Sequence, residues 1–365
     1  MATPTPVQIL DGGLGTTLED LHGITFSFDT PLWSSHLLVS GEEDKLLDCH
    51  TLNARPTNNT AFKQAGADII STATYQTSIA GFAATKAPKT GALGSEVDGI
   101  DKEGIPHFLS RAIVIASNAA GEEGKVALAL GPYGATMIPS TEYSGEYDPE
   151  HQNAQGLEKW HQERLDLFED VDTKKVSYIA FETVPRLDEI IAIRNLLTTD
   201  KIPKSLRGLP VWISSLYPND DENLPDGSTV EEVVKAALTR KEGFDTPWGI
   251  GINCTKVEKL GSLVNRYEHA IQACIDNGEP VDWPNLVLYP DGTNGEVYNT
   301  ANKTWELPPG QTQPEAPWEV TLAHAVEGAL QRGKWKSIIV GGCCKTSPEH
   351  IRKLRKTLHD GGYIP

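Results

Sequence analysis

The stretch "SIIVGGCCKTSPEHIRKLRKTLHD", residues 337–360, reads as a strand, a short loop and a helix. Its first part is an apolar β-rich run, and two glycines and two cysteines follow. The second part predicts an amphipathic helix, with Ser347 as its N-cap and Pro348 at its first position. Three apolar residues recur at helical spacing in it: Ile351, Leu354 and Leu358.

Seven more apolar runs precede this unit, and amphipathic segments separate them. Each run is nearly continuous, which is typical of parallel strands covered on both faces. Eight strand–helix units predict a (β/α)₈ TIM barrel, whereas the alternative, an open doubly wound sheet, explains the count of eight less well. No linker is evident, so we expect a single domain over residues 1–365. The seven runs are "VQIL" (7–10), "ADIISTATY" (67–75), "KVALALG" (125–131), "VSYIAFE" (176–182), "LPVWISSL" (209–216), "WGIGINC" (248–254) and "NLVLYP" (285–290).

Long polar segments follow the second, third, fifth and seventh runs, over residues 81–104, 132–152, 217–228 and 291–317. In a barrel, the loops that follow the strands lie on one face, and that face carries the active site. Extended loops of this kind are usually functional. We therefore expect the site at the carboxyl ends of the strands.

The composition is that of an ordinary globular protein, with 39% hydrophobic and 22% charged residues. A formal net charge of −18 argues against general affinity for nucleic acid or an anionic membrane. No apolar run approaches the ~20 residues of a membrane-spanning helix, and the N-terminus does not resemble a signal peptide. Five cysteines in 365 residues suit a reducing compartment, so we expect a cytoplasmic protein.

Three cysteines lie at strand ends: Cys254 ends the sixth run, and Cys343 and Cys344 end the eighth. The two ends share one rim of a barrel, so the three sulfurs can meet there. Adjacent residues can both face one ion only where the backbone leaves the strand, and Gly341 and Gly342 make that easy. Three thiolates suit Zn²⁺ with an open fourth position. Spacing alone leaves a redox pair or buried packing cysteines as alternatives.

The other two cysteines, Cys49 and Cys274, lie in helical segments. A buried cysteine in a helix usually serves as a small apolar side chain. We therefore expect these two to be packing residues.

An ordered set of motifs extends over almost the whole chain: "ILDGGLGTTLE", "PLWSSHLL", "STATYQTS", "GPYGA" with "EYSGEY", "AFETVP", "GINC" and "VGGCCKTSPEHI". Together these motifs resemble the homocysteine S-methyltransferases. Two of them, "PLWS" and "GPYGA…EYSGEY", look like the branch that uses S-methylmethionine or S-adenosylmethionine as methyl donor. The resemblance implies zinc held by Cys254, Cys343 and Cys344, with homocysteine sulfur in the open position.

The resemblance also implies roles for residues near other strand ends. Asp11 of "DGG" and Glu182 of "FET" would receive the amino group of homocysteine, because an ammonium group requires carboxylate acceptors. Gly12 would let the backbone approach a small ligand, and Tyr75 and Gln76 could line the donor site. Without the resemblance, a turn residue and a helix-entry charge would explain Asp11 and Glu182. An aromatic residue at a barrel mouth is also commonly a packing residue.

One segment departs from the family pattern. After the seventh run the family often reads Tyr-Pro-Asn-Ser-Gly-Glu, and this chain reads "YPDGTNGEVY" from Tyr289 to Tyr298. Either Asp291 or Asn294 could take the place of the asparagine. The departure bears on donor preference.

Together these features predict a zinc-dependent enzyme of methionine biosynthesis. A methyl group would pass from a sulfonium donor to the thiolate of homocysteine, which is itself the nucleophile, so no catalytic side chain is required. A betaine-dependent homocysteine methyltransferase and a non-catalytic zinc- or redox-sensing barrel remain alternatives. Oligomeric state does not follow from the sequence.

Overall fold

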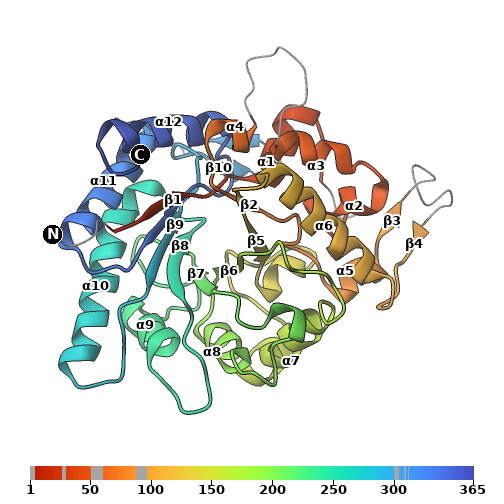
Figure 1. The fold of residues 1–365 in the computed structure, drawn as a ribbon, viewed down its shortest axis with the longest axis horizontal. Helices are drawn as coiled ribbons and strands as arrows, with labels where there is room; N and C mark the ends of the chain where they lie inside the picture. Colours follow the sequence, from red (N-terminus) through yellow and green to blue (C-terminus); the bar gives the residue numbers. More distant parts are fainter. Residues whose placement is uncertain are drawn as a thin grey trace.

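The computed structural model describes residues 5–26, 30–50, 61–87, 97–299, 304–307, 310 and 312–365. Eight strands lie at the centre of the molecule, and helices surround them (Figure 1). All strand pairs of this sheet are parallel. The predicted (β/α)₈ barrel is therefore confirmed. Its strands are β1 (Val7–Ile9), β2 (Ile69–Ser71), β5 (Lys125–Leu130), β6 (Tyr178–Val184), β7 (Val211–Ser215), β8 (Gly249–Asn253), β9 (Asn285–Tyr289) and β12 (Ile338–Val340).

The ring of strands closes between the first and second strands. The hydrogen-bonded order is β1-β12-β9-β8-β7-β6-β5-β2, and a parallel bridge between Leu10 and Ile69 joins its two ends. The amide of Asp11 also donates to the Ile69 carbonyl at 3.1 Å. Closure places Asp11 beside the end of β2.

Helices follow the strands in sequence and cover the outside of the barrel (Figure 1). The cap predicted at Ser347 is confirmed as a capping box with His350, and α9 begins with a second capping box, Thr229 with Glu232. Within the described ranges, no helix is long and apolar enough to cross a membrane. The helices are α1 (Leu14–His22), α2 (His36–Ser40), α3 (Glu43–His50), α4 (Phe62–Ala65), α5 (Ile79–Ala83), α6 (Ile105–Ala120), α7 (Ala154–Asp166), α8 (Leu187–Leu196), α9 (Val230–Leu238), α10 (Leu260–Asp276), α11 (Trp318–Arg332) and α12 (Pro348–Asp360).

The apolar core has two main parts, because alternate residues of a strand face opposite sides. The larger cluster packs the strands against the helices. A smaller cluster takes the alternate strand residues and fills the barrel interior, with Trp212, Tyr178 and Tyr289 among its largest members. The Trp212 indole donates to the Tyr289 hydroxyl at 3.2 Å, so the interior beneath the carboxyl ends of the strands is filled.

Two of the strands are less than half as long as the runs that predict them. The run at 67–75 is extended only over Ile69–Ser71, because hydroxyl groups then compete for backbone partners: Thr74 donates to the Ala129 carbonyl at 2.7 Å. The run at 337–343 ends at Val340. Beyond it, the amides of Gly342 and Cys343 leave the ladder and donate to the carbonyls of Asp11 and Pro290.

Two of the segments expected to be long loops contain additional structure. After β2, helix α5 is followed by a two-stranded hairpin, β3 (Lys86–Ala87) and β4 (Val97–Asp98), whose connecting residues lie outside the described ranges. After β9, a second hairpin pairs β10 (Val297–Asn299) with β11 (Thr304–Glu306). Both hairpins lie in segments that follow barrel strands.

Candidate active site

A cavity of about 730 Å³, its open mouth included, lies at the carboxyl ends of the barrel strands. This is the face on which the sequence predicts the site. Its lining brings together residues that are far apart along the chain. Among them are Asp11 with Gly12, Trp33, Ser71 with Tyr75, Glu142 with Tyr143, Glu182 with Thr183, Cys254, Tyr289, and Cys343 with Cys344.

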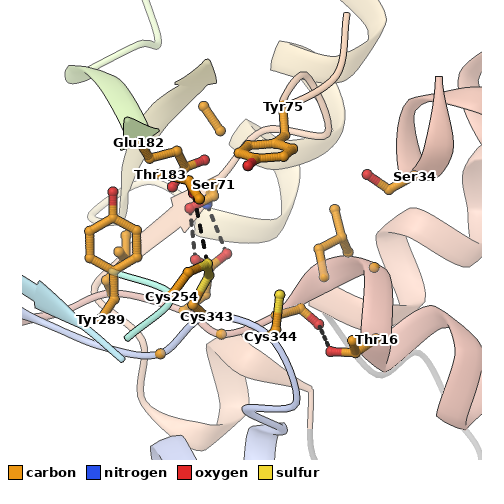
Figure 2. Close-up of a pocket in the computed structure, with 18 of the residues that line it drawn as sticks. Thr16, Ser34, Ser71, Tyr75, Glu182, Thr183, Cys254, Tyr289, Cys343 and Cys344 are labelled. Atoms are coloured by element: carbon orange, nitrogen blue, oxygen red, sulfur yellow. Dashed lines mark hydrogen bonds between the residues drawn. A yellow bond between two sulfur atoms is a disulfide. The ribbon is translucent and has the colours of Figure 1, made fainter. Parts of the chain in front are cut away.

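The three predicted cysteines meet in this cavity. The sulfur atoms of Cys254, Cys343 and Cys344 all lie within 4.8 Å of one another. Cys254 and Cys343 are joined as a disulfide with their Cα atoms 5.5 Å apart, and Cys344 is a free thiol. Figure 2 shows Glu182, Tyr289 and Tyr75 around the Cys254 and Cys343 sulfurs, with Cys344 on the side nearer Thr16.

Glycines make room for the turn that carries Cys343 and Cys344. A Cβ on Gly341 would lie 2.6 Å from the Leu10 carbonyl oxygen, and one on Gly342 would lie 2.1 Å from the Thr346 side chain. A Cβ on Gly13 would meet the Cys343 carbonyl at 2.5 Å. The turn therefore packs directly on the segment after β1, and both cysteines leave the strand as predicted.

Cys254 and Thr183 have strained backbones. Their φ angles are 45° and 61°, and a positive φ is rare for residues with a Cβ and unusual for a β-branched one. Asn253 holds both segments: its side chain accepts from the Thr183 amide and donates to the Thr183 hydroxyl, each at 2.8 Å. A backbone conformation of this kind persists only where the surrounding contacts hold it in place, and it is found most often at functional sites.

Each of the three sulfurs has a polar neighbour. The Thr183 hydroxyl lies 3.7 Å from Cys254, the Asn253 amide lies 3.8 Å from Cys343, and the Tyr143 hydroxyl lies 3.9 Å from Cys344. Contacts of this kind orient metal ligands. Asn253, Thr183 and Tyr143 were missed in the sequence, and the only available signal was their position beside a cysteine or a motif acid.

The cysteine cluster fits a thiophilic cation. Tetrahedral zinc with Zn–S distances of about 2.3 Å requires sulfurs ~3.8 Å apart, which is within the observed limit of 4.8 Å once the disulfide is reduced. Burial raises the pKa of the Cys344 thiol to about 12, so this sulfur becomes a thiolate at neutral pH only beside a compensating positive charge. Three soft donors with no fourth protein ligand in the described cluster match an open zinc site.

Two carboxyl groups, those of Asp11 and Glu182, also line the cavity. Asp11 is 1% exposed and accepts hydrogen bonds from the Ser71 amide and hydroxyl, both at 2.8 Å. Burial raises the pKa of Asp11 to about 7 despite these bonds. Burial also raises the pKa of Glu182 to about 8, and the Tyr289 hydroxyl and Arg164 partly offset that effect. The raised pKa values mark two carboxyl groups whose negative charge the surrounding protein compensates only in part, so a cation bound beside them would favour their charged forms.

An aromatic and acidic wall completes the cavity. Tyr75 packs edge-on against Trp33 with ring centroids 6.3 Å apart, and Tyr143 lies beside them with a 45% exposed side chain. Glu142 also lines the cavity, and its Oε2 atom is buried without a hydrogen-bond partner among the described residues. Burial raises the pKa of this carboxyl group. Trp33, Glu142 and Tyr143 belong to motifs that the sequence analysis quoted, but no residue-level signal separated them from packing residues.

Of the remaining predicted residues, some line the cavity and others do not. Gly12 lines the cavity, although a Cβ there would first meet the Thr346 carbonyl at 2.4 Å. Gln76 does not line it, as far as the described residues show. Asp291 is half-buried near Cys344, whose pKa its charge raises, whereas Asn294 is exposed with φ at 51°. Of these two, Asp291 is the one beside the cysteines.

Cys49 and Cys274 lie where the packing interpretation predicts. Cys49 in α3 is fully buried and Cys274 in α10 is 7% exposed, and both belong to the large apolar cluster. They take no part in the cavity.

Comparison with known proteins identifies related chains over nearly the full length. The family model described as homocysteine S-methyltransferase matches residues 8–358. Homocysteine S-methyltransferase 2 of Saccharomyces cerevisiae is 28% identical over 354 residues, which cover 96% of this chain and 94% of the yeast protein. Homocysteine S-methyltransferase 3 of Arabidopsis thaliana is 29% identical over 364 residues, which cover 96% and 90%.

Solved structures share the fold. The homocysteine methyltransferase MmuM of Escherichia coli, in its metallated form, aligns with a TM-score of 0.65 at 24% identity over 96% of each chain. Its oxidized form aligns with a TM-score of 0.66 over the same shares. These alignments support the barrel assignment independently of the strand pattern.

Proposed function

The chain belongs to the homocysteine S-methyltransferase family, and we propose that it transfers a methyl group from a sulfonium donor to homocysteine, with zinc as cofactor. The observation that carries this proposal is one cavity lined both by three sulfurs within 4.8 Å of one another and by the carboxyl groups of Asp11 and Glu182. An amino acid with a terminal thiol has the matching groups, a sulfur at one end and an ammonium at the other.

The acceptor side would be formed by Cys254, Cys343 and Cys344 together with Asp11 and Glu182. Zinc held by the three sulfurs would supply the positive charge that makes a substrate thiol a thiolate at neutral pH. Asp11 and Glu182 would accept hydrogen bonds from the substrate ammonium group. Their raised pKa values reflect burial, and an ammonium group beside them would favour their charged forms.

The donor side would be formed by Trp33, Tyr75, Glu142 and Tyr143. Aromatic faces attract cations, and the unpartnered carboxyl oxygen of Glu142 adds a negative charge to the same wall. A sulfonium group such as that of S-methylmethionine or S-adenosylmethionine has the required charge. Gln76 lies outside the lining, so we do not include it in the donor side.

The reaction needs alignment more than acid–base chemistry. The substrate sulfur forms a bond to the methyl carbon, the carbon–sulfur bond of the donor breaks, and its electron pair remains on a neutral thioether. Because the leaving group is uncharged, no side chain has to protonate it. The chain's residues would hold the two sulfurs and the methyl group in line, which can lower the barrier substantially.

A betaine donor is the second candidate, because the same aromatic wall would also attract a quaternary ammonium group. The two are separated by one experiment. Reduced, zinc-loaded protein is incubated with homocysteine and S-methylmethionine, S-adenosylmethionine or betaine, and methionine is measured. Methionine from a sulfonium donor supports the proposal, methionine from betaine alone supports the second candidate, and none from any donor contradicts methyl transfer.

A further inference from the structure

Arg164 is a buried cation whose hydrogen bonds go to backbone carbonyls at the edge of the cavity. It lies on α7 and is 2% exposed. Its Nη1 donates to the Gly131 carbonyl at 2.6 Å, and its Nη2 donates to the carbonyls of Thr74 and Tyr75 at 3.0 and 2.7 Å. One planar guanidinium group therefore joins the segment after β2 to the segment after β5.

A buried carboxylate accompanies this cation. Glu189 on α8 is fully buried and accepts from the Tyr133 amide at 2.8 Å, the Tyr147 hydroxyl at 2.6 Å and His161 Nε2 at 2.9 Å. Burial lowers the pKa of Arg164 to about 10, and the nearby charge of Glu189 is among the effects that oppose this. Arg164 thus stays cationic at neutral pH, and its charge strengthens its bonds to the carbonyls.

The carbonyls that Arg164 holds determine where Tyr75 lies. The Gly131 amide donates back to the Tyr75 carbonyl at 3.0 Å, so the two segments are tied in both directions. The Tyr75 ring packs so closely on Gly131 that a Cβ there would lie 2.7 Å from it. On its other side the ring contacts Trp33. Arg164 itself does not line the cavity, whereas Tyr75 does.

We propose that Arg164 is a positioning residue for methyl transfer: by clamping the carbonyls of Tyr75 and Gly131, it holds the Tyr75 ring in the wall that receives the methyl donor. The inference rests on the proposed function. It assigns to α7, which has no residue in the cavity lining, a direct influence on how the donor is aligned with the acceptor sulfur.

The geometry requires arginine in particular. A guanidinium group presents a rigid fork of donors, and here two of its nitrogens reach three carbonyls of two chain segments. A lysine keeps the charge but offers one flexible nitrogen, which cannot bridge both segments in the same way. Loss of the fork would loosen Tyr75 without removing any group that touches substrate.

The test compares Arg164→Lys with Arg194→Lys. Arg194 is a matched control, because it is also buried, at 5% exposed, and also donates to two backbone carbonyls, those of Thr239 and Asp245. Those residues lie in the segment between α9 and β8, at the opposite end of the barrel. Both variants remove a buried guanidinium group and its hydrogen bonds to backbone carbonyls, so both should lower the melting temperature.

Only Arg164→Lys should change the kinetics toward the donor. We expect its KM for the sulfonium donor to rise about tenfold or more, or its kcat to fall by a similar factor, because small displacements in the site have large effects on rate. Its KM for homocysteine and its zinc content should match those of Arg194→Lys. Identical donor kinetics in the two variants would overturn the inference while leaving methyl transfer intact, whereas an inactive wild type would contradict the proposed function itself.

A double-mutant cycle tests whether Arg164 acts through Tyr75. In a Tyr75→Leu background, the additional Arg164→Lys change should leave donor KM within about twofold, since the ring it positions is gone. Equal effects of Arg164→Lys with and without the Tyr75 ring would contradict the inference. If Arg164→Lys does not fold, Gly131→Ala serves instead, because its Cβ displaces the Tyr75 ring while Arg164 is intact. Unchanged donor kinetics in Gly131→Ala would equally overturn it.

Discussion

Asp11 and Glu182 differ in the hydrogen bonds that the protein donates to their carboxyl groups. Asp11 has two hydrogen bonds from Ser71, so part of its acceptor capacity is already used. Glu182 receives the Tyr289 hydroxyl, and the charge of Asp11 further raises its pKa. Of the two, Glu182 has more to gain from an incoming ammonium group.

Replacing Glu182 by Gln tests this contact, since the change keeps the size and removes the charge. A hydrogen bond to a charged group contributes about 1.5–3 kcal/mol, so apparent affinity for homocysteine should fall roughly tenfold to a hundredfold. Zinc content should stay at the wild-type value, as measured by metal analysis. Lost zinc would make Glu182 part of the metal shell, and unchanged kinetics at low homocysteine would remove it from the site.

The three cysteines should be individually necessary for zinc. Cys254→Ser, Cys343→Ser and Cys344→Ser each remove one of three soft donors, and reduced wild-type protein should contain about one zinc per chain. Each variant should lose most of that metal. Cys274→Ser is the control, because this buried cysteine lies in α10 away from the cavity. Full zinc retention in all three site variants would refute the site.

Residue chemistry explains which site residues the sequence could reveal. The three cysteines follow apolar runs, and the ends of parallel strands must meet on one rim, whereas only the family resemblance pointed to Asp11 and Glu182. Glu142 and Tyr143 lie in a loop after β5 whose path no periodicity predicts. The strained φ of Thr183 and its pairing with Asn253 depend on contacts between distant strands, so they could not be predicted locally.

At the scale of elements, the turn between β12 and α12 depends on close packing against the segment after β1. Gly13 donates its amide to the Thr346 carbonyl at 3.0 Å, and a Cβ on Gly13 would lie 2.5 Å from the Cys343 carbonyl oxygen. Both contacts are with backbone, which cannot swing aside as a side chain would. Any side chain at Gly13 therefore has to shift the turn that carries two proposed ligands.

Gly13→Ala should accordingly weaken zinc binding although it removes no ligand. The expected result is at least tenfold weaker retention in a chelator competition, in line with the effect of disturbing the groups that orient metal ligands. Gly261→Ala is the matched control, because Gly261 lies in α10 with open space around its Cβ position. That control should be neutral or slightly stabilising. Equal zinc affinity in the two variants would show that the turn tolerates displacement.

The elements themselves were predictable in number and order but not in length. Continuous apolar runs locate all eight barrel strands, because a strand that is buried on both faces consists almost entirely of apolar residues. β2 and β12 end early because threonine hydroxyls and glycine contacts redirect the backbone, which apolar periodicity does not record. The hairpins β3–β4 and β10–β11 were likewise hidden in polar segments.

At the scale of the whole molecule, barrel closure brings together sulfurs that are far apart along the chain. Cys254 and Cys343 are 89 residues apart in sequence and are joined as a disulfide. Mild oxidation of reduced, zinc-free protein should therefore form this bridge and inactivate the enzyme, while bound zinc should slow the loss. Peptide mapping checks the pairing, and Cys344 should remain a free thiol. Bridges that involve only Cys49 or Cys274 would contradict the arrangement.

Closure also determines how the stability of the whole fold depends on pH, because it buries Glu182 beside Asp11. The pKa of Glu182 rises from 4.5 in the unfolded chain to about 8 in the folded protein. Between these values the folded state binds more protons than the unfolded state, so the contribution of this group to stability falls as pH rises and is lost above about pH 8.

The Glu182→Gln variant tests this pH dependence, because the glutamine side chain does not titrate and every other acidic group is the same in both proteins. In zinc-free, reduced protein, the stability of Glu182→Gln relative to wild type should therefore increase by on the order of 2 kcal/mol between about pH 6 and about pH 9. Denaturant unfolding at the two pH values measures it. A constant difference would mean that the pKa of Glu182 in the folded protein is not raised into this range, which would contradict a carboxyl group whose charge the protein leaves uncompensated for the ammonium group of homocysteine.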